Sequence, residues 1–425
     1  MTSRRTLVAI TSAAALLVGV AGVTAPAATS AAAQSSARSA APATRSVLFV
    51  GNNWDGTVDV VTPDSRLRRL GRINVIPDIE KRMNEIYTDP VRLGYYLGIR
   101  ELVGEGHDQY VDDMYTTRDG RLLVVSRPSL ADVVAIRVST GRLAWRFKVD
   151  GQRSDHMAIS PDGRRVAVSA STGNVVHELD IRTGEELGRF PTGDSPHENV
   201  YSETGERIFN ASIGMVYTPA DQPALDSTKG ERYFQVVDAD THEVLRRIDM
   251  GKKLDQAGHP DMSSAVRPMT FSPNERFVYF QVSFFHGFVE YDRRQDRVRR
   301  VAQLPVDDHV EDMPREQYLL DSAHHGIAMN RRGTRLCVAG TMSDYATVVS
   351  RRTLAHHGLV RAGRKPYWAT RDPSGRFCFV SWSGSDRVST ISYATGKEIG
   401  RRAVGDHPQR MRMGHVRTGW LRAQR

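Results

Sequence analysis

The chain has 425 residues, of which 40% are hydrophobic, 8% aromatic and 25% charged, a composition that excludes disordered, collagen-like and coiled-coil chains. Its two cysteines exclude a disulfide-rich scaffold, a thiolate zinc cage and an iron–sulfur cluster. The formal net charge is +9, or +7 without the N-terminal Arg4 and Arg5, and the other Lys and Arg residues are scattered along the chain. This pattern predicts a basic soluble surface and no nucleic-acid partner.

The first 33 residues, Met1–Ala33, have the organisation of a signal peptide. Arg4 and Arg5 form a positive start, Leu7–Val23 is an uncharged apolar run, and small-residue cleavage sites follow. The paired arginines also resemble a twin-arginine signal, and both export routes stay open. Residues 34–45 are rich in Ala, Ser and Thr, which indicates a flexible spacer. We therefore expect a secreted or extracellular protein with no stable membrane span in the mature chain.

A repeat of about 42 residues fills the remainder of the chain. The turn glycines Gly120, Gly163 and Gly205 are 43 and 42 residues apart, and Gly333 and Gly375 are 42 apart. The longer interval between Gly205 and Gly333 holds one further repeat and two insertions. Each unit contains four short β-patterned segments separated by turn signals such as Pro-Asp-Gly and Thr-Gly. This period and strand number are typical of the blades of a β-propeller.

The two ends of the repeat region supply one further blade between them. Val47–Val75 contains three strand patterns but lacks an innermost strand, whereas His407–Gly414 begins a repeat that has no blade behind it. Pairing these segments would close the ring and remove both free sheet edges. The predicted fold class is therefore all-β, a single seven-bladed propeller over residues 46–420 in which the C-terminal strand completes the first blade.

Three motifs carry a family resemblance. Leu48-Phe-Val-Gly-Asn-Asn53, the Ser-Pro-Asp-Gly turn and the Asp-x-x-Thr-Gly turn are similar to those of the YVTN/YncE-like seven-bladed propellers, which belong to the lactonase-like superfamily and have WD40-like repeats. The resemblance covers essentially the whole mature chain and implies the propeller fold. Repeat motifs of this kind specify a fold and leave the function open.

Four insertions interrupt the repeats. All of them lie in loops that follow a second strand or join an outer strand to the next blade, and both loop types emerge on the same face. The insertions are residues 76–109, 213–231, 251–266 and 305–322. Within the first, Asp89-Pro90 predicts the start of a short helix over Val91–Val103. Because the decoration is confined to one face, we expect this decorated face to be the working face.

The residues seven to nine positions before each turn glycine begin the innermost strands and should surround the channel on the decorated face. They are more polar than the strand residues that follow, and we call them the channel ring. The channel ring comprises Asp112, Asp113, Asp155, His156, His197, Glu198, Arg267, His324, His325, Tyr367, Trp368 and, by analogy, Gln409 and Arg410. So many ionisable residues around one axis predict a binding or catalytic site.

Two chemistries fit this ring. Three imidazoles and a carboxylate suit a divalent metal such as zinc, copper or manganese, and the candidate ligands are His156, His197, Glu198 and His325. Alternatively, those histidines or Tyr367 would act as catalytic proton acceptors, as in the architecturally similar propeller polysaccharide lyases. The candidate substrate-binding residues are Asp113, Arg267, Trp368 and Arg410.

Two functions therefore stay open. The first is a secreted, monomeric binding protein for an envelope glycan, peptide, protein or small acidic molecule. The alternative is a metal-assisted or His/Tyr-based lyase or hydrolase that acts on an acidic sugar or lactone. Motifs for phosphoryl transfer and α/β-hydrolase chemistry are missing from the sequence.

Residues outside the ring give weaker signals. His177, His242 and the pair His356-His357 are expected to be solvated. Cys337 and Cys378 occupy nearly corresponding positions in neighbouring repeats, so both a disulfide and two buried thiols remain possible.

Overall fold

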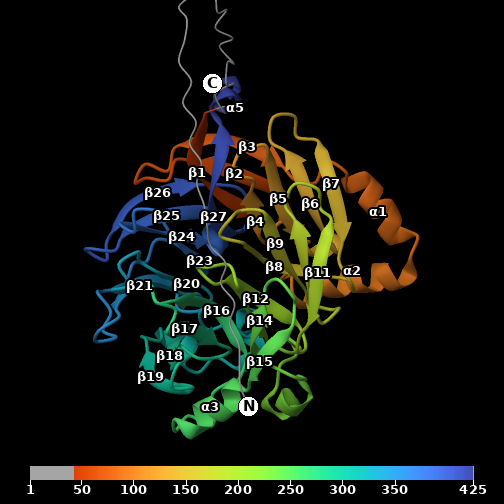
Figure 1. Cartoon of the computed structure of the whole chain (residues 1–425). Coiled ribbons are helices and arrows are strands. Elements are labelled where there is room, and N and C mark those ends of the chain that lie inside the picture. Colours follow the sequence, from red (N-terminus) through yellow and green to blue (C-terminus); the bar gives the residue numbers. More distant parts are fainter. Residues whose placement is uncertain (1–42, 425) are drawn as a thin grey trace, which may run out of the picture. The chain divides into compact units, whose positions relative to one another are not determined.

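Seven small antiparallel sheets surround a central axis in the computed structural model, which describes residues 43–424 (Figure 1). This arrangement confirms the predicted seven-bladed propeller. The predicted signal peptide lies outside the described residues. Thr44 and Arg45, which we assigned to the spacer, instead begin the first strand.

We number the blades from 1 to 7 in chain order. Blade 1 contains β1 (Thr44–Asn52), β2 (Thr57–Val61), β3 (Arg69–Asn74) and β27 (Pro408–Arg417). Blade 2 contains β4 (Met114–Thr116), β5 (Leu122–Arg127), β6 (Asp132–Arg137) and β7 (Leu143–Lys148). Blade 3 contains β8 (Ser154–Ile159), β9 (Arg165–Ala170), β10 (Val175–Asp180) and β11 (Glu186–Pro191). Blade 4 contains β12 (Pro196–Tyr201), β13 (Arg207–Ser212), β14 (Phe234–Asp238) and β15 (Val244–Ile248).

The last three blades follow the same plan. Blade 5 contains β16 (Val266–Phe271), β17 (Phe277–Val282), β18 (Gly287–Asp292) and β19 (Arg297–Gln303). Blade 6 contains β20 (Ile327–Met329), β21 (Arg335–Gly340) and β22 (Tyr345–Ser350), and isolated bridges to His356 and Val360 replace a regular outer strand. Blade 7 contains β23 (Pro366–Arg371), β24 (Phe377–Trp382), β25 (Arg387–Ser392) and β26 (Glu398–Ala403).

The C-terminal strand closes the ring as predicted. β27 pairs antiparallel with β1 from Thr44↔Arg417 to Asn52↔Pro408, so it takes the innermost position of blade 1. Both faces of each sheet are covered by neighbouring blades, which explains the continuous apolar runs in the strands. In β1, Val47 and Phe49 pack with blade 2, whereas Leu48 and Val50 pack with blade 7.

The repeated turns form for local reasons. Asp162 accepts hydrogen bonds from the Ser160 hydroxyl (2.5 Å) and the Arg164 backbone (3.0 Å). The next residue, Gly163, has a φ of +70°, a left-handed conformation that glycine adopts at low steric cost. These contacts fix the ends of the inner strands, and so fix where each blade begins and ends.

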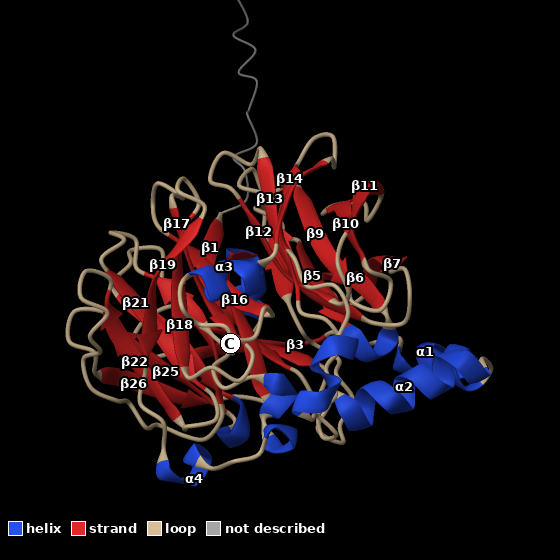
Figure 2. Cartoon of the chain, turned by 90° about the horizontal axis from the view of Figure 1, so that it is seen from below, coloured by secondary structure: helices blue, strands red, loops and turns tan. Residues whose placement is uncertain are grey.

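The insertions carry helices on one side of the propeller, as Figure 2 shows for α1 (Ile79–Tyr87), α2 (Pro90–Leu102) and α4 (Asp308–Glu311). α3 (Met250–Gln256) follows β15, and α5 (Thr418–Ala423) follows β27. The predicted helix in the first insertion is confirmed as α2, since the Asp89 carboxylate caps it by accepting hydrogen bonds from the backbone of Val91 and Arg92. α1 was not predicted.

The two cysteines are joined. Cys337 on β21 and Cys378 on β24 form a disulfide between blades 6 and 7, with a Cα–Cα distance of 6.4 Å. Of the two possibilities that the sequence left open, the structure has the disulfide.

One prediction about the remaining histidines is wrong. His177 is fully buried, with its Nδ1 2.8 Å from Glu186 and its Nε2 3.1 Å from the backbone nitrogen of Asp150. It lies on the third strand of its blade, where β11 and the neighbouring blade cover it. His242 is half-buried beside Glu178, whereas His356 and His357 are exposed as expected.

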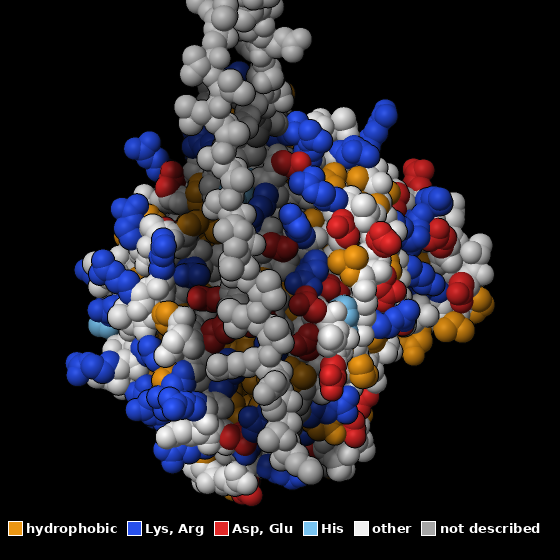
Figure 3. Space-filling view, viewed as in Figure 1, with side chains coloured by type: hydrophobic (Ala, Val, Ile, Leu, Met, Phe, Trp, Pro, Cys, Tyr) orange, Lys and Arg blue, Asp and Glu red, His pale blue; other side chains and the backbone are white. Residues whose placement is uncertain are grey.

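Figure 3 shows Lys and Arg interspersed with Asp and Glu on the face that it presents. Within residues 43–424, no helix has the length and apolar character needed to cross a bilayer.

Candidate functional site

The residues of the channel ring converge on the central axis, and none of them is more than 5% exposed. They lie at or just before the starts of the seven innermost strands β27, β4, β8, β12, β16, β20 and β23. In β8, for example, Asp155 and His156 together stand opposite the single residue Ser169 of β9. β12, β16 and β27 contain the same kind of β-bulge, which inserts one extra residue and re-aims side chains.

Serines in the second strands hold these bulges in place. Ser126 donates a hydrogen bond to the carbonyl of Asp155 (2.8 Å), and Ser169 donates to that of His197 (3.1 Å). Ser381 donates in the same way to the carbonyl of Gln409 (2.6 Å). Each contact runs from one blade to the first bulge residue of the next blade. The ring is therefore fixed by the packing of adjacent blades.

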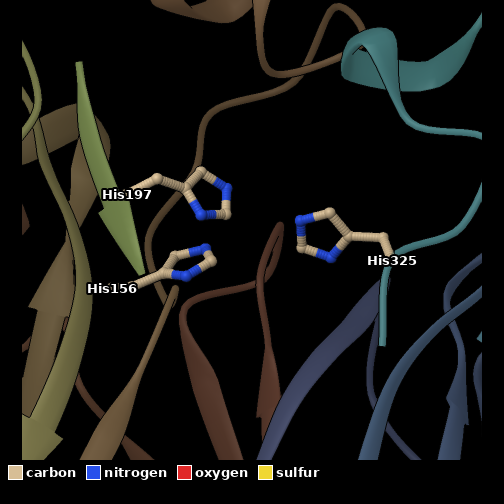
Figure 4. A group of neighbouring side chains, drawn as sticks. All are labelled: His156, His197 and His325. Atoms are coloured by element: carbon tan, nitrogen blue, oxygen red, sulfur yellow. The ribbon is translucent and has the colours of Figure 1, made fainter. Parts of the chain in front are cut away.

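Three histidines of the ring face one another (Figure 4). His156, His197 and His325 each offer a nitrogen within 4.8 Å of the others. Two nitrogens that bind one metal at 2.0–2.1 Å are at most about 4 Å apart, so a side-chain movement of under about 1 Å would complete a metal site. The predicted convergence of these histidines is thus present in the structure, while their roles remain predictions.

The imidazoles are in the state that binds metals. Burial and the nearby charge of Arg410 lower the pKa values of His156 and His325 well below the usual value for histidine. Burial and the neighbouring His325 lower the pKa of His197 in the same way. The rings are therefore neutral at physiological pH. His197 Nδ1 and both nitrogens of His325 have no hydrogen-bond partner among residues 43–424.

Glu198 contacts a histidine directly. Its carboxylate lies 2.8 Å from Nδ1 of His156, and both residues are buried. This carboxylate–imidazole contact is typical of a group that orients a metal-binding histidine from behind. Burial raises the pKa of Glu198 to about 7.

Arg410 brings a cation to the same site. Its guanidinium carbon lies 3.9 Å from the centre of the Trp368 ring, and its Nε is 3.4 Å from Asp112. Both terminal nitrogens of Arg410 lack a hydrogen-bond partner in the described chain. Burial raises the pKa of Asp112 to about 7, which leaves this carboxyl group only partly ionised at neutral pH.

Arg267 and Tyr367 lie beside the three histidines. Arg267 bonds Ser283 through Nε (3.0 Å), while its Nη2 has no partner within the described residues. Tyr367 stacks on His325 with a centroid distance of 4.2 Å. Burial raises the pKa of Tyr367, which keeps its phenol protonated and makes it a poor proton acceptor.

Other predicted ring residues make contacts within the protein. Asp113 accepts two hydrogen bonds from Arg412 (2.8 and 2.7 Å) and one each from the backbone of Met114 and Met157. These contacts indicate a structural role for Asp113, and its predicted role in ligand binding stays untested. His324 turns towards Tyr345, whose hydroxyl is 3.3 Å from its Nε2.

Two charged residues of this site were not predicted from the sequence. Arg412 lies two residues beyond Arg410 on β27, so the alternation of a strand could have placed it on the same face. Arg153 precedes β8 and forms an ion pair with Asp155 (2.6 Å). No sequence signal separated Arg153 from the many arginines in loops.

The decorated face covers the ring. Leu319 and Leu320, from the insertion over 305–322, pack on Tyr367. A cavity of about 270 Å³ instead reaches Glu198 and Trp368 and is lined by the far ends of the inner strands. Two larger cavities, of about 530 and 720 Å³, lie among the insertions on the decorated face, so the assignment of the working face stays a prediction.

No protein-family model matches the sequence, and no curated protein matches it.

Proposed function

We propose that this protein is an exported β-propeller that binds a small acidic ligand at the channel ring, together with a divalent metal held by His156, His197 and His325. One observation carries the proposal. Imidazole and guanidinium nitrogens of the ring are buried without hydrogen-bond partners in the described chain, on His197, His325, Arg267 and Arg410. Buried polar atoms in folded proteins almost always have a partner, so a bound metal and a bound anion would account for them.

The metal part of the proposal rests on the donor set. Three neutral imidazoles suit zinc, copper or manganese, and a site with three protein ligands leaves a position for a further ligand. Glu198 is better placed as the partner of His156 than as a fourth ligand, because its carboxylate already contacts Nδ1 of that imidazole. A bound metal would act as a Lewis acid towards an oxygen of the ligand.

The charge balance supports an acidic ligand. The charged groups of the site are Arg153, Arg267, Arg410 and Arg412 against Asp112, Asp113, Asp155 and Glu198. Because Asp112 and Glu198 have pKa values of about 7, the site carries a net positive charge near neutral pH even without a metal. An anion would neutralise this charge and accept the free guanidinium hydrogens.

The remaining parts of the proposal come from the sequence. The N-terminal pattern supports export, so an envelope glycan, an acidic peptide or a small acidic molecule would be the natural ligand class. The motifs at Leu48–Asn53 and in the turns support a place among the YVTN/YncE-like propellers.

A second candidate function is catalysis, and the pair His156–Glu198 favours it. A carboxyl group with a pKa of about 7 can accept and release a proton at neutral pH, which is what a general base requires. The reaction would be a lyase or hydrolase reaction on an acidic sugar or lactone, with Arg267 and Arg410 neutralising the substrate carboxylate.

Calorimetric titration tests the binding proposal. We expect purified protein to bind about one zinc ion, and the zinc-loaded protein to bind galacturonate as a probe acid. H325Q should weaken zinc binding about 100-fold or more, whereas H415Q, which changes an exposed histidine, should not alter it. R410Q should weaken galacturonate binding, while the exposed control R402Q should not. Equal zinc affinity of H325Q and the wild type would contradict the proposed metal site.

A further inference from the structure

The decorated side of the ring is closed by residues from three separate insertions. Val103, Val216, Leu319 and Leu320 pack together with Met342 on the ring residue Tyr367, and we call this group the roof. Tyr367 is 4% exposed, Leu319 6% and Leu320 8%. A ligand that approached from this side would have to displace apolar side chains contributed by distant parts of the chain.

A network of ion pairs connects the insertions that form the roof. Lys229, which is 2% exposed, donates to Asp321 (2.9 Å) and also pairs with Asp221. Arg315 reaches Asp221 from the other insertion (3.0 Å), and the Thr218 hydroxyl donates to Asp321 (2.8 Å). These contacts tie the insertion over 213–231 to the insertion over 305–322, directly beside Leu320.

The backbone of the roof is correspondingly constrained. Leu320 and Asp321 have φ values of +50° and +59°, and two consecutive left-handed residues other than glycine are unfavourable unless their surroundings hold them. The backbone nitrogen of Phe284 also donates to the carbonyl of Asp321 (2.9 Å). The backbone of the roof is therefore held in a defined conformation by its contacts with the rest of the protein.

The opposite side of the ring is hollow. The cavity of about 270 Å³ is lined by Glu198, Trp368 and Arg412, so it reaches the carboxylate that contacts His156. Its walls include Thr270 and Thr370, which lie near the ends of β16 and β23 and next to the repeat turns. We call it the turn-face cavity, because the repeat turns lie on this side of the propeller.

The lining of the turn-face cavity has a distinct chemistry. Tyr115, Tyr201 and Trp368 supply aromatic surface, while Arg412 and the exposed Arg371 supply positive charge. Its volume lies just below the range for small-molecule pockets, about 300–1,000 Å³. Such a cavity suits a small anion with a flat or ring-shaped apolar part, or the acidic end of a longer chain.

We infer that the ligand reaches the channel ring through the turn-face cavity, and that Trp368 and Arg412 select a small, anionic, ring-shaped molecule there. The inference rests on the proposed ligand-binding function and specifies the side of access and the ligand class. It also assigns the insertions a different task, which is to close the far end of the channel.

Site-directed blocking tests the side of access. T270C places a thiol in the turn-face cavity, and V216C places one in the roof. Both native cysteines are joined in a disulfide, so each variant has a single reactive thiol. Each variant is compared with itself before and after labelling with benzyl methanethiosulfonate, so a general loss of stability is controlled. Thermal melting confirms that the labelled proteins remain folded.

Two readouts decide the inference. The first is the rate at which metal-free protein takes up Co²⁺, which we expect the label at position 270 to slow about tenfold or more and the label at 216 to change less than about twofold. The second is the rate at which diethyl pyrocarbonate modifies His197, measured by peptide mass spectrometry, and the same pattern is expected. The second readout needs no metal.

The outcomes separate the inference from the proposed function. If unlabelled protein binds no Co²⁺ at saturation, the metal proposal fails, and the His197 readout alone decides the side of access. Slowing by the label at 270 alone supports access through the turn-face cavity. Slowing by the label at 216, by both labels or by neither overturns it.

Discussion

The contact between Asp113 and Arg412 gives a quantitative test of the division between structural and ligand-binding residues in the ring. Asp113 is fully buried and accepts two hydrogen bonds from Arg412. Its carboxylate also accepts a hydrogen bond from the backbone nitrogen of Met157 (3.1 Å), which links blade 2 to blade 3. D113N would leave the Arg412 guanidinium, whose side chain is only 18% exposed, without its paired counter-charge. Breaking one partner of a buried ion pair costs about 3–5 kcal/mol.

This free energy can be measured as a melting temperature. The unfolding entropy of roughly 380 described residues, at about 2.1 cal/mol/K per residue, converts 3–5 kcal/mol into a fall in Tm of about 4–6 °C. R412M combined with D113N should recover part of the loss, because the double variant leaves no unpaired charge. A fall in Tm below about 1 °C for D113N would refute the structural role and return Asp113 to the candidate ligand-binding residues.

The closure of the ring, the disulfide and the buried His286 can each be tested by a stability measurement. Ending the chain at Gly405 removes β27 and should abolish the cooperative thermal unfolding that circular dichroism follows. Ending it at Arg417 leaves β27 in place and should preserve the transition. Equal melting curves for the two truncated chains would contradict the closure of the ring. C337A should lower the free energy of unfolding, measured by urea denaturation, by about 4 kcal/mol, because the disulfide joins residues with a sequence separation of 41. An unchanged midpoint of the urea transition would show that the disulfide does not stabilise the protein. Burial lowers the pKa of His286 to about 4, so the unfolded chain takes up the proton first as the pH falls. The free energy of unfolding should therefore fall by about 2 kcal/mol between pH 6.5 and 5, and H286Q should lack this contribution. Wild-type and H286Q proteins whose free energies of unfolding change in parallel with pH would contradict the prediction.

The fold was predictable because the repeats carry similar turn motifs at the same position. Gly163 and its equivalents fix the period, and the orphan strand at His407 reveals the closure, so the blade count follows from the sequence alone. The positions of the ring residues followed from the same period. The contacts of those residues did not follow, since the bulges that re-aim Asp155 and His156 depend on pairing with β9.

The cover over the ring could not be predicted for a related physical reason. Topology places the four insertions on one face, but only packing shows that Leu319 and Leu320 close the channel there. The same limit explains His177, which was expected to be solvated but is buried, because its burial depends on the neighbouring strand β11 and the adjacent blade. Local patterns identify strands and turns, whereas exposure is decided by neighbours that are distant in sequence.

The most direct test of the proposed site is a crystal structure of the protein after soaking in a zinc salt, with diffraction measured above and below the zinc absorption edge. We predict an anomalous difference peak between His156, His197 and His325, at about 2.0–2.1 Å from a nitrogen of each imidazole. An ordered crystal whose only zinc peaks lie elsewhere, with these three imidazoles unchanged, would contradict the account.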